Sequence, residues 1–271
     1  MAEFSGQLFL RAEARADGST ALAGQSFRAP FHISKPYWDA DTGVLLVQVV
    51  NPTAGILRGD RLESEIAVGA GASLLVTTPS ASRIFQMEGG TAESRQRFRV
   101  EAGGWLEVAP EALVPHRGAR FHQKTVIEVE PGGRLFFVDQ LQPGRVAHGE
   151  AWLWDRLCLE LDVRWGGELV LRERLDQSGA ELRALAELAG SGPAACFANA
   201  VLLEEGKESL WRGAVGALHR DGLWVGISAL RHGWSIRLVS PDSIRLRQGL
   251  ADLRRILSAH FPPMTCSFRK V

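Results

Sequence analysis

The stretch Ile127-Glu-Val129-Glu-Pro-Gly132-Gly-Arg-Leu135 shows the pattern that decides the fold. Alternation before the glycine places Ile127 and Val129 on one face of a strand, and Gly132 can adopt the positive φ that a tight reversal needs. The same pattern of an apolar residue, Val, Gly and Leu returns in three further stretches, Ile66–Leu74, Phe98–Leu106 and Leu161–Leu169. Each copy therefore predicts a hairpin, two strands joined by a glycine turn.

The copies begin 32, 29 and 34 residues apart. Four copies with the same apolar positions favour ordered stacking of these units over unrelated glycine turns, although the unequal spacing argues against a strict solenoid. Alternating or apolar runs predict more strands at 7–12, 26–33, 44–50, 223–230 and 234–239. The chain is predicted to be mainly β and to form a single domain over residues 1–271.

Helix is the minor element. The strongest prediction runs from about Pro241 to His260, where leucines at 246, 250, 253 and 257 form one apolar stripe. Ser240 is a candidate N-cap, Pro241 suits the first helical position, and Pro262 stops the helix. The stripe is expected to cover the β core, and a shorter helix is predicted at 180–189.

The charges exclude two classes of partner. The 31 basic and 31 acidic side chains cancel, so the chain lacks the basic footprint that binding to nucleic acid or to an anionic membrane requires. No run of about 18 apolar residues and no signal-peptide core is present, which predicts a cytoplasmic protein. Cys158, Cys196 and Cys266 are widely spaced and are expected to be reduced thiols.

Familiar catalytic motifs are missing from the sequence. It contains no HExxH, no GxSxG and no Walker A loop, so the chain is predicted not to be an enzyme. None of the seven histidines stands near a cysteine at zinc-ligand spacing. His116 and His122 are an even number apart and could share a strand face, either in ordinary hydrogen bonds or in contact with a metal or partner.

Several motifs in a fixed order resemble one protein family. They are Asn51-Pro-Thr-Ala-Gly55-Ile-Leu-Arg-Gly59-Asp60-Arg-Leu62, then Leu74–Ile84 with its Leu-Leu-Val-Thr-Thr core, then Leu106–Phe121 ending in Gly-Ala-Arg-Phe. Asp139, Gly144-Arg145 and Gly149-Glu150 follow in the same order. Together they resemble the urease accessory protein UreD, called UreH in some bacteria, over most of residues 7–175.

This resemblance implies a non-enzymatic scaffold. UreD proteins bind urease apoprotein together with the helical protein UreF and, through it, the GTPase UreG, which delivers nickel. The family fold is a β-helical stack of sheets with about two α-helices, one near the C-terminus here, and an internal tunnel is its proposed nickel route. No tightly bound cofactor is expected, only transient Ni²⁺.

The resemblance also suggests site residues. Four carboxylates are candidate transient nickel ligands, because weak oxygen ligands release an ion more readily than a Cys or His cage: Asp60, Glu111, Asp139 and Glu150. Residues expected to support the motifs or the tunnel are Gly59, Arg83, Arg145, Gly149 and His116. Arg254 and Arg255, on the helix face opposite the leucines, are predicted to bind a partner without contributing to folding.

Some positions depart from the family pattern. Arg58 replaces the first glycine of GGD, Thr53-Ala54 replaces a small or Gly-rich pair, His116 replaces an aromatic residue, and Asp139 replaces the usual Glu. Arg58 is expected to alter the turn near Asp60 and to narrow or charge a tunnel opening there. A divergent UreD paralogue that serves another metalloenzyme is therefore an alternative.

Two other classes stay open at this point. A β-sandwich module that binds carbohydrate or another ligand could use Trp152 and Trp154 as a platform on one strand face. An enzyme could use His116 and Glu111 together. In either reading the chain need not bind a GTPase or a helical accessory protein.

Overall fold

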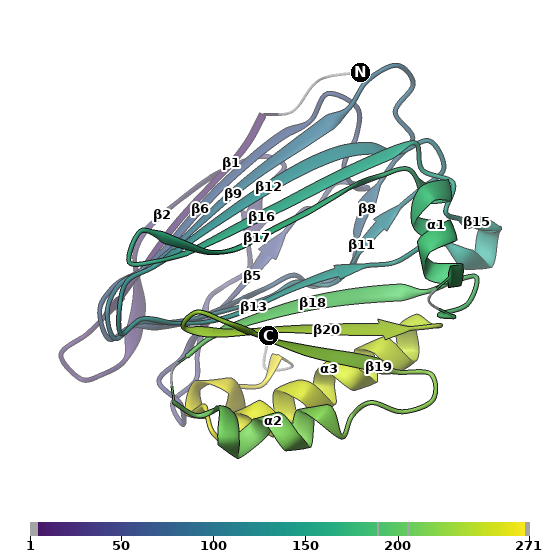
Figure 1. Cartoon of the computed structure of the whole chain (residues 1–271). Helices are drawn as coiled ribbons and strands as arrows, with labels where there is room; N and C mark the ends of the chain where they lie inside the picture. Colours follow the sequence, from purple (N-terminus) through teal and green to yellow (C-terminus); the bar gives the residue numbers. More distant parts are fainter. Residues whose placement is uncertain (1–4, 189, 205, 269–271) are drawn as a thin grey trace.

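The computed structural model describes residues 5–188, 190–204 and 206–268, which form two stacked β-sheets, with two helices over the outer face of one sheet and another at one end of the stack (Figure 1). The first sheet has seven strands, in the order β17-β16-β12-β9-β6-β1-β2. Five of them are parallel neighbours, and an antiparallel strand closes each edge. In chain order the bounds are β1 Ser5–Ala14, β2 Thr20–Arg28, β6 Arg61–Val68, β9 Ala92–Val100, β12 Arg120–Val129, β16 Arg156–Trp165 and β17 Glu168–Gln177.

The second sheet has eleven strands, with the main path β19-β20-β18-β13-β10-β7-β5-β3. Its centre, from β5 to β13, is parallel, whereas β18, β20 and β19 continue it in antiparallel fashion. The path strands are β3 His32–Ile33, β5 Leu45–Val50, β7 Ser73–Thr77, β10 Trp105–Ala109, β13 Arg134–Leu141, β18 Cys196–Leu203, β19 Trp224–Leu230 and β20 Gly233–Ser240. Short strands off this path are β4 Tyr37–Trp38, β8 Ser82–Ile84 and β11 Leu113–Pro115, and β14 Gly144–Arg145 pairs separately with β15 Glu150–Ala151.

The hairpin prediction is wrong for the first three copies of the repeat. Their strands do not pair with each other: each glycine turn carries the chain from the seven-stranded sheet to the eleven-stranded one, and successive copies stack in parallel. Gly71, Gly103 and Gly132 have φ of 71°, 75° and 85°. In each four-residue turn the N–H of the residue after this glycine donates to the carbonyl of the first residue. A positive φ at the third residue is the type II turn requirement, and Pro131 suits the second position.

The fourth copy is a true hairpin. β16 and β17 pair antiparallel across Gly166 and Gly167, whose φ values of 54° and 84° fit a two-residue type I′ turn. In the parallel register Val129 lies beside Trp165, not beside the Val163 that the repeat aligns with it. The chain thus turns two residues early relative to the stack and folds back along the sheet edge. The predicted fold class, a mainly β, β-helical stack of sheets and hairpins, is confirmed.

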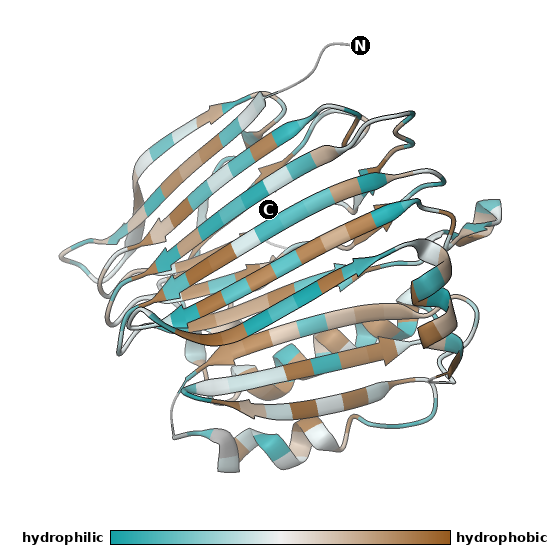
Figure 2. Cartoon of the chain, turned by 45° about the horizontal axis from the view of Figure 1, so that its top comes forward, coloured by the Kyte–Doolittle hydropathy of each residue, from teal (hydrophilic) through white to brown (hydrophobic). Residues whose placement is uncertain are grey.

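Alternation of apolar and polar residues gives the two sheets a shared core. Figure 2 shows the resulting bands across the seven-stranded sheet. Inward residues such as Ile66, Phe98 and Ile127 meet Leu74, Leu106 and Phe137 of the other sheet, and all are buried. No helix in the described ranges is both long and apolar enough to cross a membrane.

The described residues contain three α-helices, one more than the sequence predicted. α1 (Gly179–Leu188) and α3 (Ser243–Ser258) match the predictions, although α3 starts after Asp242, whose side chain accepts a hydrogen bond from the Arg245 N–H at 2.8 Å. Leu246, Leu253 and Leu257 of α3 are buried against the eleven-stranded sheet, as expected. α2 (Glu208–Gly216) was missed; Trp211 and Val215 supply its buried face, and Leu218, just after the helix, is buried in the same cluster. The 3-10 turns are η1 Val146–His148 and η2 Pro262–Thr265.

Arg254 does not belong to an exposed face, and the expectation that it is free to bind a partner is wrong. Its guanidinium contacts Glu107 of β10 through two hydrogen bonds, at 2.7 and 3.1 Å, and donates to the Cys266 carbonyl at 2.8 Å. Glu107 is fully buried, and the Arg254 side chain is 16% exposed. Arg255, by contrast, is 72% exposed, and its role in partner binding stays a prediction.

Candidate functional site

A polar patch interrupts the core between the two sheets. The inward positions Ser64, Gln96 and Thr125 lie in one row across β6, β9 and β12, and Ser94 and Gln123 form the next row. Within this patch Thr125 Oγ1 donates to Gln96 Oε1 at 3.1 Å. Such side chains are too costly to bury dry without partners, so they mark a place where the sheets do not close on each other.

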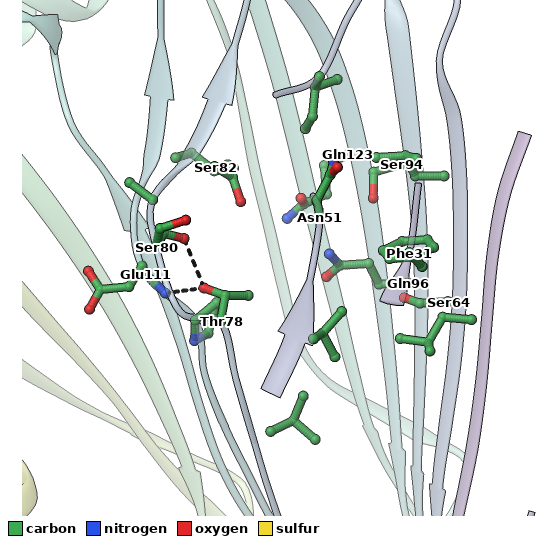
Figure 3. Close-up of a pocket in the computed structure, with 18 of the residues that line it drawn as sticks. Phe31, Asn51, Ser64, Thr78, Ser80, Ser82, Ser94, Gln96, Glu111 and Gln123 are labelled. Atoms are coloured by element: carbon green, nitrogen blue, oxygen red, sulfur yellow. Dashed lines mark hydrogen bonds between the residues drawn. The ribbon is translucent and has the colours of Figure 1, made fainter. Parts of the chain in front are cut away.

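A cavity of about 220 Å³ occupies that place. Ser64, Ser94, Gln96 and Gln123 line it from the seven-stranded sheet (Figure 3). The other sheet and the loops that follow β5 and β7 supply the opposite wall and the rim, with Asn51, Thr53, Thr78, Ser80 and Ser82 among their polar residues. Three of the motif segments, 51–62, 74–84 and 106–121, therefore border the cavity. The turns joining the sheets lie at the far ends of these strands.

Asp139 brings a carboxyl group to the cavity. It lies on β13 beside Asn199 of β18, and within the described chain no hydrogen bond or ion pair engages its side chain. Burial, with a smaller contribution from the nearby Glu173 carboxylate, raises the pKa of Asp139 to about 7. Glu173 is itself held by Arg237 at 2.6 Å and Asn199 at 3.4 Å. Near neutral pH Asp139 can therefore exist in both its protonated and its charged form.

Glu111 and Arg83 lie at the rim. The Glu111 N–H donates to Thr78 Oγ1 at 2.9 Å, which fixes the wall. The Glu111 carboxylate points away from the labelled polar residues in Figure 3 and is 3.5 Å from Arg247 of α3. Arg83, the middle residue of β8, also lines the cavity and is exposed. Of the four predicted carboxylates, Asp139 and Glu111 contribute to the cavity wall.

Asp60 and Gly59 serve a turn instead. Asp60 is buried, its Oδ2 accepts a hydrogen bond from the Leu57 N–H at 2.8 Å, and Gly59 has φ of 84°. Neither residue lines the cavity. Arg58 reaches outward, where its guanidinium donates to the Glu88 carbonyl at 2.8 Å. The expectation that Arg58 narrows or charges the cavity opening is therefore wrong.

Glu150, Arg145 and Gly149 form a separate unit around η1. The Arg145 guanidinium holds both Glu150 oxygens, at 2.7 and 2.9 Å, and this pairing lowers the pKa of Glu150. Gly149 ends η1 with φ of 68°. None of the three lines the cavity, so Glu150 and Asp139 do not face a common space.

The structure does not arrange the key residues as the ligand-binding module or the His116–Glu111 enzyme would require. His116 is buried against Phe85, with ring centroids 4.7 Å apart, and does not share the cavity that Glu111 borders. Burial is the main cause that lowers the pKa of His116. Trp152 and Trp154 are 4% and 3% exposed and belong to the core beneath α1, so they form no open platform.

Sequence reasoning found Asp139 and Glu111 but missed the serines and glutamines of the cavity wall. The signal was present as polar residues at inward positions of alternating strands, for example Ser94 and Gln96 between Ala92 and Phe98. Their partners across the stack are separated by about 30 residues of sequence, and only the register aligns them.

Comparison with known proteins agrees with the motifs. A family model described as "UreD urease accessory protein" matches residues 5–267. The chain belongs to the UreD family. A urease accessory protein UreD from Opitutus terrae is 62% identical over 271 residues, covering 99% of this chain and all of the relative. UreD of Anaeromyxobacter sp. (strain Fw109-5) is 30% identical over 256 residues, with 90% of this chain and 82% of the relative covered. UreD of Actinomyces naeslundii is 28% identical over 265 residues, 93% of each chain. The resemblance drawn from short motifs is thereby confirmed.

Proposed function

We propose that this UreD-family chain is a non-enzymatic scaffold in urease maturation, and that its inter-sheet cavity passes Ni²⁺ toward the urease apoprotein. The cavity carries the proposal: three family motifs border it, and Asp139 contributes a carboxyl group to a wall that is rich in uncharged polar side chains. Its walls offer oxygen donors without a Cys or His cage. Such donors hold a borderline cation weakly, so the ion can move on to a site that binds it more tightly.

The raised pKa of Asp139 suits passage rather than storage. A carboxyl that titrates near neutral pH exchanges its proton for a cation at modest cost, and it takes the proton back when the ion leaves. Glu111 marks the rim with a carboxylate that is held by Arg247. In this proposal Asp139 is the main transient ligand, Glu111 is secondary, and Asp60 and Glu150 have structural roles.

Partner binding is the second half of the proposal. The partners are the urease apoprotein, a UreF-like helical protein and, through it, a UreG-like GTPase, in the cytoplasm. Exposed apolar side chains support a docking surface on α1: Leu185 is 54% exposed and Leu188 is 85% exposed. Solitary exposed leucines are common, but two on one short helix favour contact with another protein. Arg255 is a candidate for a separate contact.

Nickel loading of urease tests the cavity. The urease structural and accessory genes would be co-expressed with wild-type chain, with Asp139→Ala, or with Glu150→Gln as a matched carboxylate control outside the cavity. We expect Asp139→Ala to lower the nickel content of purified urease several-fold while the complex still co-purifies. Glu150→Gln should load urease normally. Undiminished nickel with Asp139→Ala would refute the role of the cavity, and undiminished nickel without the chain would refute the function as a whole.

A further inference from the structure

The outer face of the seven-stranded sheet carries a second set of metal-binding side chains, on the side opposite the cavity. Parallel register places His122 of β12 beside Cys158 of β16, and Glu160 follows two residues later on the same face. Much of this face consists of ion-pair ladders, such as Arg172 with Asp162 at 2.7 and 2.9 Å. His122 and Cys158 bring donors of a different kind into the ladder.

The three side chains are close enough to share one ion. A ring nitrogen of His122, the Cys158 sulfur and a Glu160 carboxylate oxygen all lie within 4.8 Å of one another. The separation from His122 Nε2 to Glu160 Oε2 is 3.2 Å. Bonds of about 2.0–2.3 Å to a tetrahedral ion put two ligands roughly 3–4 Å apart, so modest side-chain rotations suffice.

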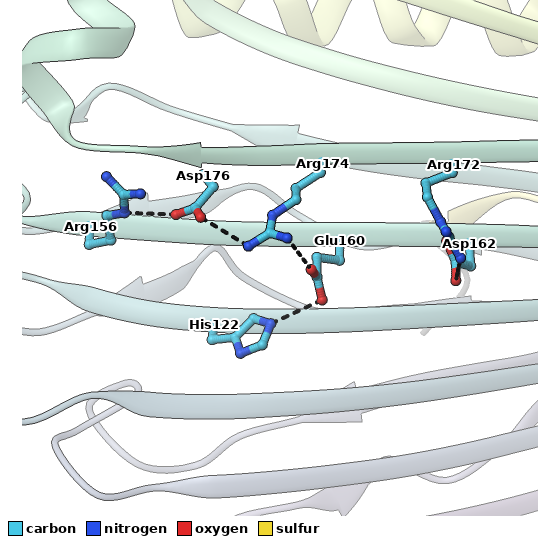
Figure 4. Close-up of polar contacts among 7 residues, drawn as sticks. All are labelled: His122, Arg156, Glu160, Asp162, Arg172, Arg174 and Asp176. Atoms are coloured by element: carbon cyan, nitrogen blue, oxygen red, sulfur yellow. Dashed lines mark hydrogen bonds and ion pairs between the residues drawn. The ribbon is translucent and has the colours of Figure 1, made fainter.

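Neighbouring charges hold Glu160 in a suitable position (Figure 4). Its Oε1 faces Arg174 at 3.4 Å, which leaves Oε2 directed at His122. Arg174 is in turn fixed by Asp176 at 3.0 Å, and Asp176 by Arg156 at 2.7 Å. A cation that takes Oε2 would keep the Arg174 contact as an outer support, the arrangement that commonly orients metal-bound carboxylates.

We propose that His122, Cys158 and Glu160 form a solvent-facing site for a borderline divalent cation, for which Zn²⁺ is the best match. The mixed nitrogen, sulfur and oxygen donors favour such an ion over Mg²⁺ or Ca²⁺. The His122 side chain is 45% exposed and that of Glu160 is 27% exposed, so water can take the fourth position. The site lies outside the cavity and does not depend on the function proposed above.

Binding at this site has a proton balance. Burial, followed by the Asp176 and Glu160 charges, raises the pKa of the Cys158 thiol, so the free protein holds the thiol proton at neutral pH. The cation must displace that proton to bond the thiolate, and the proton goes to solvent.

Cobalt is a suitable probe, because thiolate-bound Co²⁺ absorbs in the near ultraviolet. Co²⁺ would be added to the full-length, reduced protein and then displaced with Zn²⁺. We expect a charge-transfer band that saturates at one equivalent, disappears on addition of Zn²⁺ and is absent from Cys158→Ser. His122→Ala and Glu160→Gln should weaken Co²⁺ binding by about tenfold or more.

Glu128→Gln, an exposed carboxylate elsewhere on the same face, is the matched control and should bind Co²⁺ like the wild type. Thermal melts without metal would show that each variant is folded, and competition against a coloured chelator would give affinities that do not rely on the band. The proposal is overturned if the wild type shows no thiolate band, or if Cys158→Ser keeps it. An unchanged affinity in both His122→Ala and Glu160→Gln would also overturn it.

Discussion

Glu107 and Asp139 are two interior carboxyl groups on opposite faces of the same sheet. Glu107 points toward α3, where Arg254 holds it through two hydrogen bonds. Asp139 points into the cavity, where the nearest charge that affects it is the like-charged Glu173. Burial raises the pKa of both acids, but at Glu107 the arginine opposes that shift.

The difference separates a structural acid from a functional candidate. A buried charge with a matched partner fixes two elements against each other, and removing either partner is costly. An acid that lacks such a partner in a polar cavity lowers the stability of the fold at neutral pH, so its presence needs another explanation. Passage of a cation is the explanation proposed above.

The largest effect should come from breaking the Glu107–Arg254 pair. Arg254→Ala leaves a buried carboxylate without its partner, and we expect a loss of about 3–5 kcal/mol in the free energy of unfolding, measured in urea. Arg255→Ala, its exposed neighbour, should change little. In Glu107→Leu/Arg254→Met both charges are gone, and most of the loss should be recovered. A loss of stability in Arg254→Ala as small as that in Arg255→Ala would contradict this prediction.

Asp139→Asn, in contrast, should increase the free energy of unfolding. Because the pKa of Asp139 lies near 7 in the folded protein and its ordinary value is 3.8, Asp139 disfavours folding progressively as the pH rises from about 4 to 7. At about 1.4 kcal/mol per pKa unit, the amide should stabilise the protein at pH 8 by on the order of 4 kcal/mol and have little effect at pH 4. Chemical denaturation at the two pH values checks this, and equal effects at both would contradict it.

Glu173→Gln should have a smaller effect, on the pKa of Asp139. The Glu173 charge helps to raise the pKa of Asp139, so removing it is expected to lower that pKa. The decrease should be small, because burial is the main cause of the elevation. The Asp139 carboxyl carbon can be titrated by NMR in labelled protein, with Asp139→Asn used to assign the signal. An unchanged Asp139 pKa would show that the Glu173 charge does not affect Asp139.

The smallest effect is expected on the exposed ladder. Arg99 bridges Glu65 at 3.2 Å and Glu128 at 3.1 Å on the open face of the seven-stranded sheet. Arg99→Ala should cost less than about 1 kcal/mol, because solvent screens such pairs. A urea midpoint shift as large as that of Arg254→Ala would mean that ladders and buried pairs do not differ here.

The sequence predicted the strand–glycine–strand unit and the amphipathic α3, because both follow from local periodicity and turn chemistry. It could not distinguish the three inter-sheet turns from the final hairpin. Gly103-Gly104, Gly132-Gly133 and Gly166-Gly167 are the same dipeptide, yet only the last closes a hairpin. The outcome depends on where the turn falls relative to the stacked neighbours, and that is a property of the whole sheet.

The site was predictable to a similar degree. Asp139 was named from a motif and lies in the cavity wall, and its role as a nickel ligand stays a prediction. Arg254 was wrongly predicted to be exposed, because its angle around the helix axis places it away from the leucines. Its long side chain nevertheless reaches back to the buried Glu107. His122 and Cys158 could not be paired in advance, since the parallel register that joins them is set by the stack.

The glycine turns have a mechanical consequence. They join the two sheets along one edge, and the Gly103 N–H donates to the Gly132 carbonyl at 2.9 Å, so neighbouring turns also hold each other. The cavity rim, at residues 51–55 and 78–83, lies at the ends of strands remote from that edge. Any widening of the passage must therefore pivot about the line of glycines, with amide exchange slowest there and fastest at the rim.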